Sequence, residues 1–113
     1  MNIVKIFCYV FIGIVTFISH VSLAANEGVI THIAFAGENM GSHPNVVQIQ
    51  VEGGYDFTGC DKINAAIRKN DTHLISAALS AYISKTPIKV WLNSSDKYYP
   101  AQDRCVITYV ELK

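Results

Sequence analysis

Long runs of one charge sign are missing from this 113-residue chain, and low-complexity segments are missing as well. Charged residues make up only 16% of the chain, and nine basic residues balance nine acidic ones. A protein that works mainly on nucleic acid or on an anionic membrane needs a clustered basic surface. The composition therefore argues against both partners, and nothing in it indicates a disordered tail.

Signatures of catalysis and of metal binding are also lacking. The chain has no P-loop, no dinucleotide fingerprint, no G-x-S-x-G elbow and no H-E-x-x-H motif. Among His32, His43 and His73, no two have the spacing of metal ligands. Asp56 and Asp61 are close in sequence, but a paired-carboxylate glycosidase needs a cleft that so small a domain would struggle to build. We therefore predict no enzyme activity, no catalytic residue, no metal site and no cofactor.

A secretory signal peptide is predicted for residues 1–24. A short basic start is followed by the apolar run Ile6–Ile18, which is short for a bilayer span, and then by small residues in Ser22-Leu23-Ala24. Cleavage is expected after Ala24, with Ala25 as the alternative, and an uncleaved anchor is the less favoured reading. The expected mature protein is a single domain, residues 25–113, that is secreted or periplasmic and has no membrane span.

Only two of the three cysteines, Cys60 and Cys105, remain after that cleavage. Two cysteines in a small exported domain most often form one disulfide, and closing so long a loop is worth about 4 kcal/mol in the chain-entropy model. A metal pair or a catalytic thiol would need histidines nearby, and none has suitable spacing. We predict a Cys60–Cys105 disulfide.

The segment from Asp71 to Leu92 predicts a helix followed at once by a strand. Asp71 or Thr72 could cap the helix through a side-chain oxygen, and Thr86-Pro87 would end it. Ile88–Leu92 alternates as a strand would if it packed against the helix. The residues expected on the buried stripe of the helix recur at helical spacing: Leu74, Ile75, Ala78, Leu79, Tyr82 and Ile83.

Further strands are predicted from alternation and β-branched content. They are Gly28–Ala36, Val46–Glu52, Cys60–Arg68 and Arg104–Leu112. The first two are expected to form an antiparallel hairpin. Alternation in the second points Val47, Ile49 and Val51 inward, and alternation in the first separates Val29, Thr31, Ile33 and Phe35 from Ile30, His32, Ala34 and Ala36. Cys60–Arg68 also fits a helical turn, so both interpretations stay open there. Glycine, asparagine and proline content predicts a loop over 37–45, turns at 53–54 and 93–96, and an aromatic loop over 97–100.

The resulting order is three strands, one helix and two strands. We predict a mainly β, α+β fold: a small five-stranded OB-like antiparallel barrel or curled sheet, with the helix between strands three and four. A plain antiparallel sheet covered by one helix is the competing arrangement.

Trp91, Tyr98 and Tyr99 form the best candidate binding group. Sugar rings stack on aromatic side chains through their apolar C–H faces, while hydroxyl and carboxamide groups bind the sugar hydroxyls. The alternative is that Trp91 belongs to the core and the tyrosines cover the rim of the barrel.

Four short segments resemble the family formed by the B subunits of subtilase cytotoxin and of pertussis-like toxins. They are Gly28–Thr31, Val51–Gly53, the helix end running through Thr86–Val90, and Tyr98-Tyr99-Pro100. Members of that family are OB-fold subunits that form pentameric rings and bind sialylated host glycans alongside a catalytic toxin subunit.

The resemblance implies a glycan site at Glu52 and at Tyr99 with its neighbour Tyr98. The family's serine before the first strand is replaced here by Asn26 and Glu27, so Asn26 takes its place in the expected site. The family's longer C-terminal segment is absent, and the expected disulfide differs from the family's first bridge. The resemblance thus predicts an exported, oligomeric glycan-binding domain, and the alternative is a monomeric protein-binding module without a sugar or toxin role.

Overall fold

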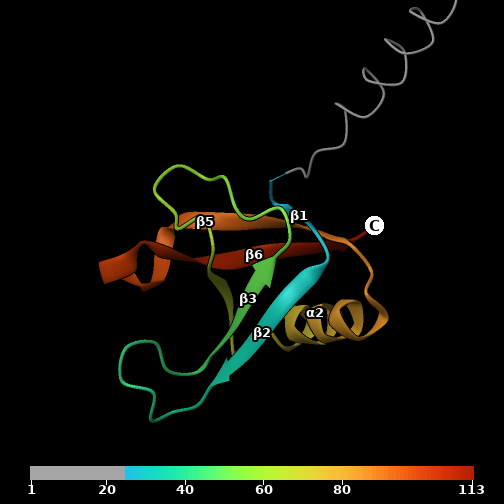
Figure 1. The fold of residues 1–113 in the computed structure, drawn as a ribbon. Coiled ribbons are helices and arrows are strands. Elements are labelled where there is room, and N and C mark those ends of the chain that lie inside the picture. The colour runs from blue at the N-terminus through green and yellow to red at the C-terminus, as the bar shows by residue number, and fades with distance from the viewer. Residues whose placement is uncertain (1–24) are drawn as a thin grey trace, which may run out of the picture.

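A computed structural model describes residues 25–113, and the predicted signal peptide lies outside this part of the chain. The described residues form a mainly β structure with one α-helix (Figure 1). Its elements are β1 (Glu27–Gly28), β2 (Ile30–Ala36), β3 (Val46–Val51), β4 (Ala65–Arg68), α2 (Thr72–Ser84), β5 (Ile88–Tyr99), the 3-10 helix η1 (Pro100–Gln102) and β6 (Arg104–Leu112). No helix within residues 25–113 is long and apolar enough to cross a membrane.

All six strands belong to one curled sheet with the order β1-β5-β6-β4-β3-β2. β1 and β2 lie at its opposite edges, yet only Val29 separates them in sequence. The sheet must therefore curl until its two edges meet. Backbone hydrogen bonds mark the meeting point, because Glu52 donates to the Val29 carbonyl and Val90 donates to the Asn26 carbonyl, both at 3.0 Å.

The strand count differs from the prediction because the expected first strand is divided in two. Gly28 has φ of 134°, a conformation that side chains rarely adopt, and an added Cβ there would lie 3.2 Å from Cβ of Glu52. The chain thus changes direction at this glycine, and the helix follows the fourth strand instead of the third. The expectation of a purely antiparallel sheet is also wrong, because β4 and β6 pair in parallel.

The core lies on the concave side of the sheet, under α2. β3 supplies three inward residues as predicted, Val47, Ile49 and Val51. β2 and β3 form the predicted antiparallel hairpin across the loop 37–45. A second, smaller cluster of buried residues contains Val46, Ala66, Tyr98 and Val106.

A register shift in β2 overturns the alternation predicted for the first strand. The shift falls between Ile30 and His32, and Ile30 and Ile33 both pack against the core although the alternation had placed them on opposite faces. A bulge adds one residue to a strand and so reverses the faces beyond it.

The helix is confirmed, and its buried face matches the predicted stripe at Leu74, Ile75 and Ala78 but not near the helix end. Ala78 and Ala81 are fully buried, and Leu74 and Ile75 pack beside them. Ile83, expected inside, is 78% exposed, and Tyr82 is also exposed. Small alanines let the helix approach the sheet closely, so the contact centres on them instead of on the bulkier residues near the helix end.

Both ends of the helix are closed by backbone groups. The side chain of Asp71 forms no capping hydrogen bond, contrary to one predicted option; its carbonyl accepts from the amides of Leu74 and Ile75. At the other end Lys85 is left-handed, and Thr86 donates to the Ala81 carbonyl at 3.0 Å, just before the predicted stop at Thr86-Pro87.

The third strand is confirmed as a strand, but it covers only Ala65–Arg68. Residues 60–64 turn instead, because the Asn64 amide donates to the Asp61 carboxylate at 2.8 Å. This turn carries Cys60, whose sulfur bonds to that of Cys105 on β6 at 2.06 Å. The predicted disulfide is therefore confirmed.

β5 continues well beyond the predicted strand Ile88–Leu92 and reaches Tyr99. The turn expected over 93–96 and the loop expected over 97–100 are both wrong. Asn93 pairs with Val106 and Lys97 with Cys105, so residues 94–96 form an irregularity within a strand that resumes. Burial of the Tyr98 ring in the second cluster keeps the far part of the strand against the sheet.

Candidate functional site

The most exposed aromatic pair lies where β5 and β6 run side by side. Trp91 and Tyr109 face each other across the two strands, 46% and 47% exposed. Their ring centroids are 5.5 Å apart and the planes are nearly perpendicular, at 88°. Edge-to-face packing of this kind holds both rings in place while leaving much of their surface open.

A shallow, open pocket of about 400 Å³ borders this pair. Its lining also includes Thr108 and Glu111 of β6. A register shift in β6 leaves Thr108 as the extra residue, since Trp91 pairs with Tyr109 and the next residue, Leu92, pairs with Ile107. The bulge exposes Thr108 and Tyr109 together, and such irregularities often re-aim side chains at binding sites.

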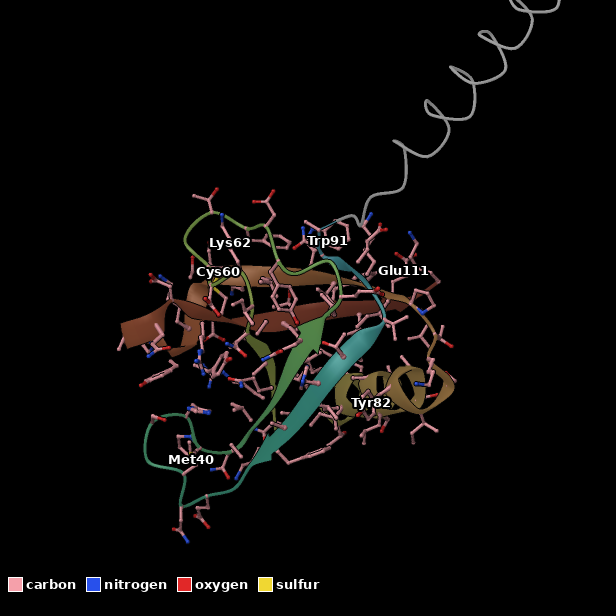
Figure 2. All side chains as sticks on the ribbon, viewed as in Figure 1. Met40, Cys60, Lys62, Tyr82, Trp91 and Glu111 are labelled. Atoms are coloured by element: carbon pink, nitrogen blue, oxygen red, sulfur yellow. A yellow bond between two sulfur atoms is a disulfide. The ribbon has the colours of Figure 1, made fainter. Side chains whose placement is uncertain are left out.

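Charged side chains surround the pair. Lys89 and Trp91 are two residues apart on β5 and so share a face, and the Lys89 ammonium lies 5.0 Å from the Trp91 ring centroid. Glu27 accepts from Lys113 at 3.0 Å and lies 3.9 Å from Lys89. Glu111 pairs with Lys89 in the strand register, yet within residues 25–113 its carboxylate makes no ion pair or side-chain hydrogen bond. Figure 2 shows Trp91 and Glu111 along the β5–β6 side of the molecule and Tyr82 on α2.

The structure settles one of the alternatives left by the sequence, because Trp91 is a surface residue and not part of the core. Tyr109, Thr108 and Glu111 were not predicted as site residues. Their place beside Trp91 depends on the strand register and on a bulge, and neither follows from alternation alone. An aromatic residue within a predicted last strand was the only available signal.

Tyr98 is only 7% exposed and its hydroxyl is already engaged. The hydroxyl donates to Oε1 of Gln48 at 2.8 Å, and Arg104 donates to the same oxygen at 3.0 Å. Burial raises the pKa of the Tyr98 phenol above its ordinary value. Tyr98, a predicted site residue, therefore has little surface open to a ligand.

Tyr99 is half-buried beside two other planar groups. The guanidinium carbon of Arg104 lies 5.2 Å from its ring centroid, and the His43 ring lies at 5.4 Å. Nε of Arg104 is buried without a hydrogen-bond partner. Tyr99 is half-buried whereas Trp91 is 46% exposed, so Tyr99 offers a ligand less surface.

Glu52 is exposed just beyond the end of β3, beside a second groove of about 640 Å³. The start of β2 and the end of α2 supply the rest of the lining, which includes Val29, Thr31, Tyr82, Ile83 and Lys85. Asn26 lies nearby with its backbone and side chain in use: its amide donates to the Gly54 carbonyl at 2.7 Å, and its Oδ1 accepts from the Asp56 amide at 2.8 Å.

The four residues predicted for the glycan site therefore lie in two places. Tyr98 and Tyr99 are together near Gln48, whereas Glu52 and Asn26 are together at the far end of β3. Glu52 follows Gln48 by four residues, which is about 13 Å along a strand. A single sugar ring could not contact both pairs.

Among residues 25–113, no three histidine, cysteine, aspartate or glutamate side chains are grouped so that they could hold a metal ion. No protein-family model matches the sequence, and no curated protein and no solved structure gives a significant match. Fold and site geometry are therefore the basis for a functional proposal.

Proposed function

We propose that this protein is an exported glycan-binding domain of the kind found in the B subunits of subtilase cytotoxin and pertussis-like toxins, and that its sugar site is the Trp91–Tyr109 pocket. The exposed perpendicular rings carry the proposal. One ring can stack on the C–H face of a sugar while the other contacts its edge, and both are already ordered, so little side-chain entropy is lost on binding. Thr108 and Glu111 supply the polar groups that hold sugar hydroxyls.

An OB-like fold is part of this proposal. If β1 and β2 are counted as one bent strand, five strands remain and α2 lies between the third and the fourth. The curling of the sheet until its edges meet at Val29 supports that assignment.

Export, oligomerisation and a toxin partner complete the proposal. The disulfide suits a secreted or periplasmic protein, because thiols stay reduced in the cytosol. By resemblance, the mature chain would form a homo-oligomer such as a pentamer, and would bring a catalytic subunit to cell-surface glycans. Light scattering on the purified mature chain would measure the oligomeric state, and a monomer would count against this part.

A glycan array tests the binding function. We expect the mature chain to bind and Trp91→Ala to weaken binding about five- to thirtyfold, since stacking on one aromatic ring is worth about 1 to 2 kcal/mol. Phe35→Ala is the matched control, because it removes a 61% exposed aromatic elsewhere in the sheet. Tyr99→Phe and Glu52→Ala test the sites implied by the resemblance: loss in either, with Trp91→Ala unaffected, would move the site there. No binding by folded protein would contradict the proposal.

A protein-binding module is the second candidate, and one observation favours it. β2 is an edge strand of seven residues without a charged side chain apart from His32, and Phe35 is exposed on it. Unpaired backbone groups on such an edge can accept a strand from a partner. If this is the function, we expect the protein to be a monomer that binds extended peptides and does not bind sugars.

A further inference from the structure

The groove between the start of β2 and the end of α2, called here the β2–α2 groove, lies on other elements than the Trp91–Tyr109 pocket of β5 and β6. We propose that it is a second binding site, which takes an extended segment of a partner protein as an added strand on β2. The apolar side chains of that segment cover the end of α2, and one basic and one acidic side chain meet Glu52 and Lys85. This goes beyond both functions above, because a domain with two such sites binds a glycan and a protein partner at once.

The first step concerns the free edge of β2. Within residues 25–113, the strand pairs only with β3, and no other backbone hydrogen bond uses a group of Ile30–Ala36. After the register shift near its start, β2 pairs regularly from His32 to Ala36. The strand contains no lysine, no proline and no acidic residue, which are the residues that usually protect an exposed edge. Such an edge is suited to pairing with a partner strand.

The second step concerns the apolar wall beside this edge. The groove has a volume of about 640 Å³, with residues 29–31 on one side and Tyr82, Ile83 and Lys85 on the other. Tyr82 is 40% exposed, and Ile83, at 78%, is the most exposed large apolar side chain within residues 25–113. Figure 1 shows α2 beside β2, and Figure 2 shows Tyr82 on the helix. A strand paired with β2 would direct every second side chain toward the side of the sheet on which α2 packs, and would cover these two residues.

The third step concerns charge. Glu52 follows β3 and Lys85 follows α2, so each wall of the groove carries one charge, and the two signs are opposite. Both side chains are exposed, and within residues 25–113 neither belongs to an ion pair. A segment with one basic and one acidic side chain complements both walls. Exposed charges of this kind contribute more to the choice of partner than to affinity.

Fluorescence anisotropy with synthetic peptides tests strand addition to the mature chain. The probe is a labelled, end-capped nonapeptide in which valine alternates with threonine, except for a lysine near one end and a glutamate near the other. One further version carries N-methyl groups on the valine amides, and another carries them on the amides of the intervening residues. Only alternate amides of an added strand donate to its neighbour. We therefore expect one version to bind like the probe and the other at least about tenfold more weakly, because it loses several hydrogen bonds.

Substitutions in the groove test the two walls. Ile83→Ala should weaken binding of the probe about fivefold, because less apolar surface is covered. Ile63→Ala is the matched control: it removes the same side chain at a site that is 60% exposed and does not line the groove, and binding should be unchanged. Glu52→Gln should weaken binding about threefold in dilute buffer and by less in concentrated salt, which screens exposed charges.

Equal binding of the probe and of both methylated versions would overturn strand addition, and so would the absence of saturable binding. Undiminished binding by Ile83→Ala would overturn the role of the helix. If light scattering showed that Ile83→Ala dissociates an oligomer of the mature chain, the groove would be a contact between copies and the proposal would fall. Glycan binding should be unchanged in Ile83→Ala, since the sugar pocket lies on β5 and β6, and a blank glycan array would contradict the sugar site alone.

Discussion

At the scale of single residues, two phenols are buried in different parts of the sheet. Tyr55 is 3% exposed and donates to the Ile49 carbonyl at 2.7 Å, while Tyr98 donates to Gln48. Burial raises the pKa of both phenols above the ordinary value. The segment holding Tyr55 has no regular structure and was not predicted as part of the core, since nothing in its sequence repeats with a helical or strand period.

These phenols predict a loss of stability in alkali. Below about pH 10 they are protonated in the folded and unfolded chains alike, so pH has no effect through them. Above about pH 10 the unfolded chain releases protons that the folded chain retains, and stability falls by up to about 1.4 kcal/mol per pH unit for each phenol. Urea unfolding at a series of alkaline pH values measures this slope, which Tyr98→Phe should reduce by about half.

Phe35→Ala is the control for this experiment, because it removes an exposed aromatic ring without a phenol and so should leave the slope unchanged. Equal slopes in the unmodified chain and in Tyr98→Phe would show that Tyr98 ionises without unfolding.

At the scale of elements, the sequence predicted where the helix lies better than which face it buries. Spacing and the Thr86-Pro87 stop located α2, but hydropathy ranked Ile83 above Ala81 for burial. The distance between helix and sheet decides which helix side chains are buried, and that distance is set only when the chain folds. The prediction for β5 was wrong for a related reason. Asn93–Asp96 has the composition of a turn, but these residues lie within a strand whose far part is held against the sheet by the buried Tyr98 ring.

Substitutions on α2 test the observed face. Ala81→Leu should lower the free energy of unfolding by about 1 to 3 kcal/mol, because a fully buried site has no room for added methyl groups. Ile83→Ala should change it by less than about 0.5 kcal/mol, since that side chain is exposed. Urea unfolding followed by circular dichroism measures both, and the reverse ranking would restore the stripe predicted from the sequence.

The candidate site was predictable only in part, for reasons that also belong to strands. Trp91 stood out as an aromatic in a strand, but Tyr109 and Glu111 join it through register and through the bulge at Thr108. Tyr98 and Tyr99 are adjacent in sequence and were predicted together. Strand geometry sends neighbours to opposite faces, which buries one and leaves the other partly open.

At the scale of the whole molecule, the single helix and the disulfide followed from the sequence, whereas the sheet has six strands instead of five because the first expected strand is divided. The parallel pairing of β4 with β6 did not follow from the sequence, because it joins segments whose sequence separation gives no local signal. Cys60–Cys105 spans 45 residues and fastens the turn before β4 to β6. It therefore links two parts of the sheet that are far apart in sequence.

Removal of this disulfide should be costly. Cys60→Ala combined with Cys105→Ala is expected to lower the free energy of unfolding by about 4 kcal/mol, because the unfolded chain regains the freedom of a long loop. Urea unfolding of the unmodified chain with and without a reductant provides the parallel measurement. A difference below about 1 kcal/mol in both experiments would show that the noncovalent contacts alone hold β6 in place.

The first and last strands of the described residues 25–113 reach the same strand, β5, from opposite sides. Glu27 in β1 pairs with Lys89, while Leu112 in β6 pairs with Ile88, and the Lys113 ammonium meets the Glu27 carboxylate. A purification tag or surface linker attached directly to residue 25 or residue 113 would consequently lie close to Trp91 and obstruct the proposed sugar pocket. The hairpin loop 37–45 projects away from β1 and the C-terminus (Figure 1), and so offers the better anchoring point for immobilised assays.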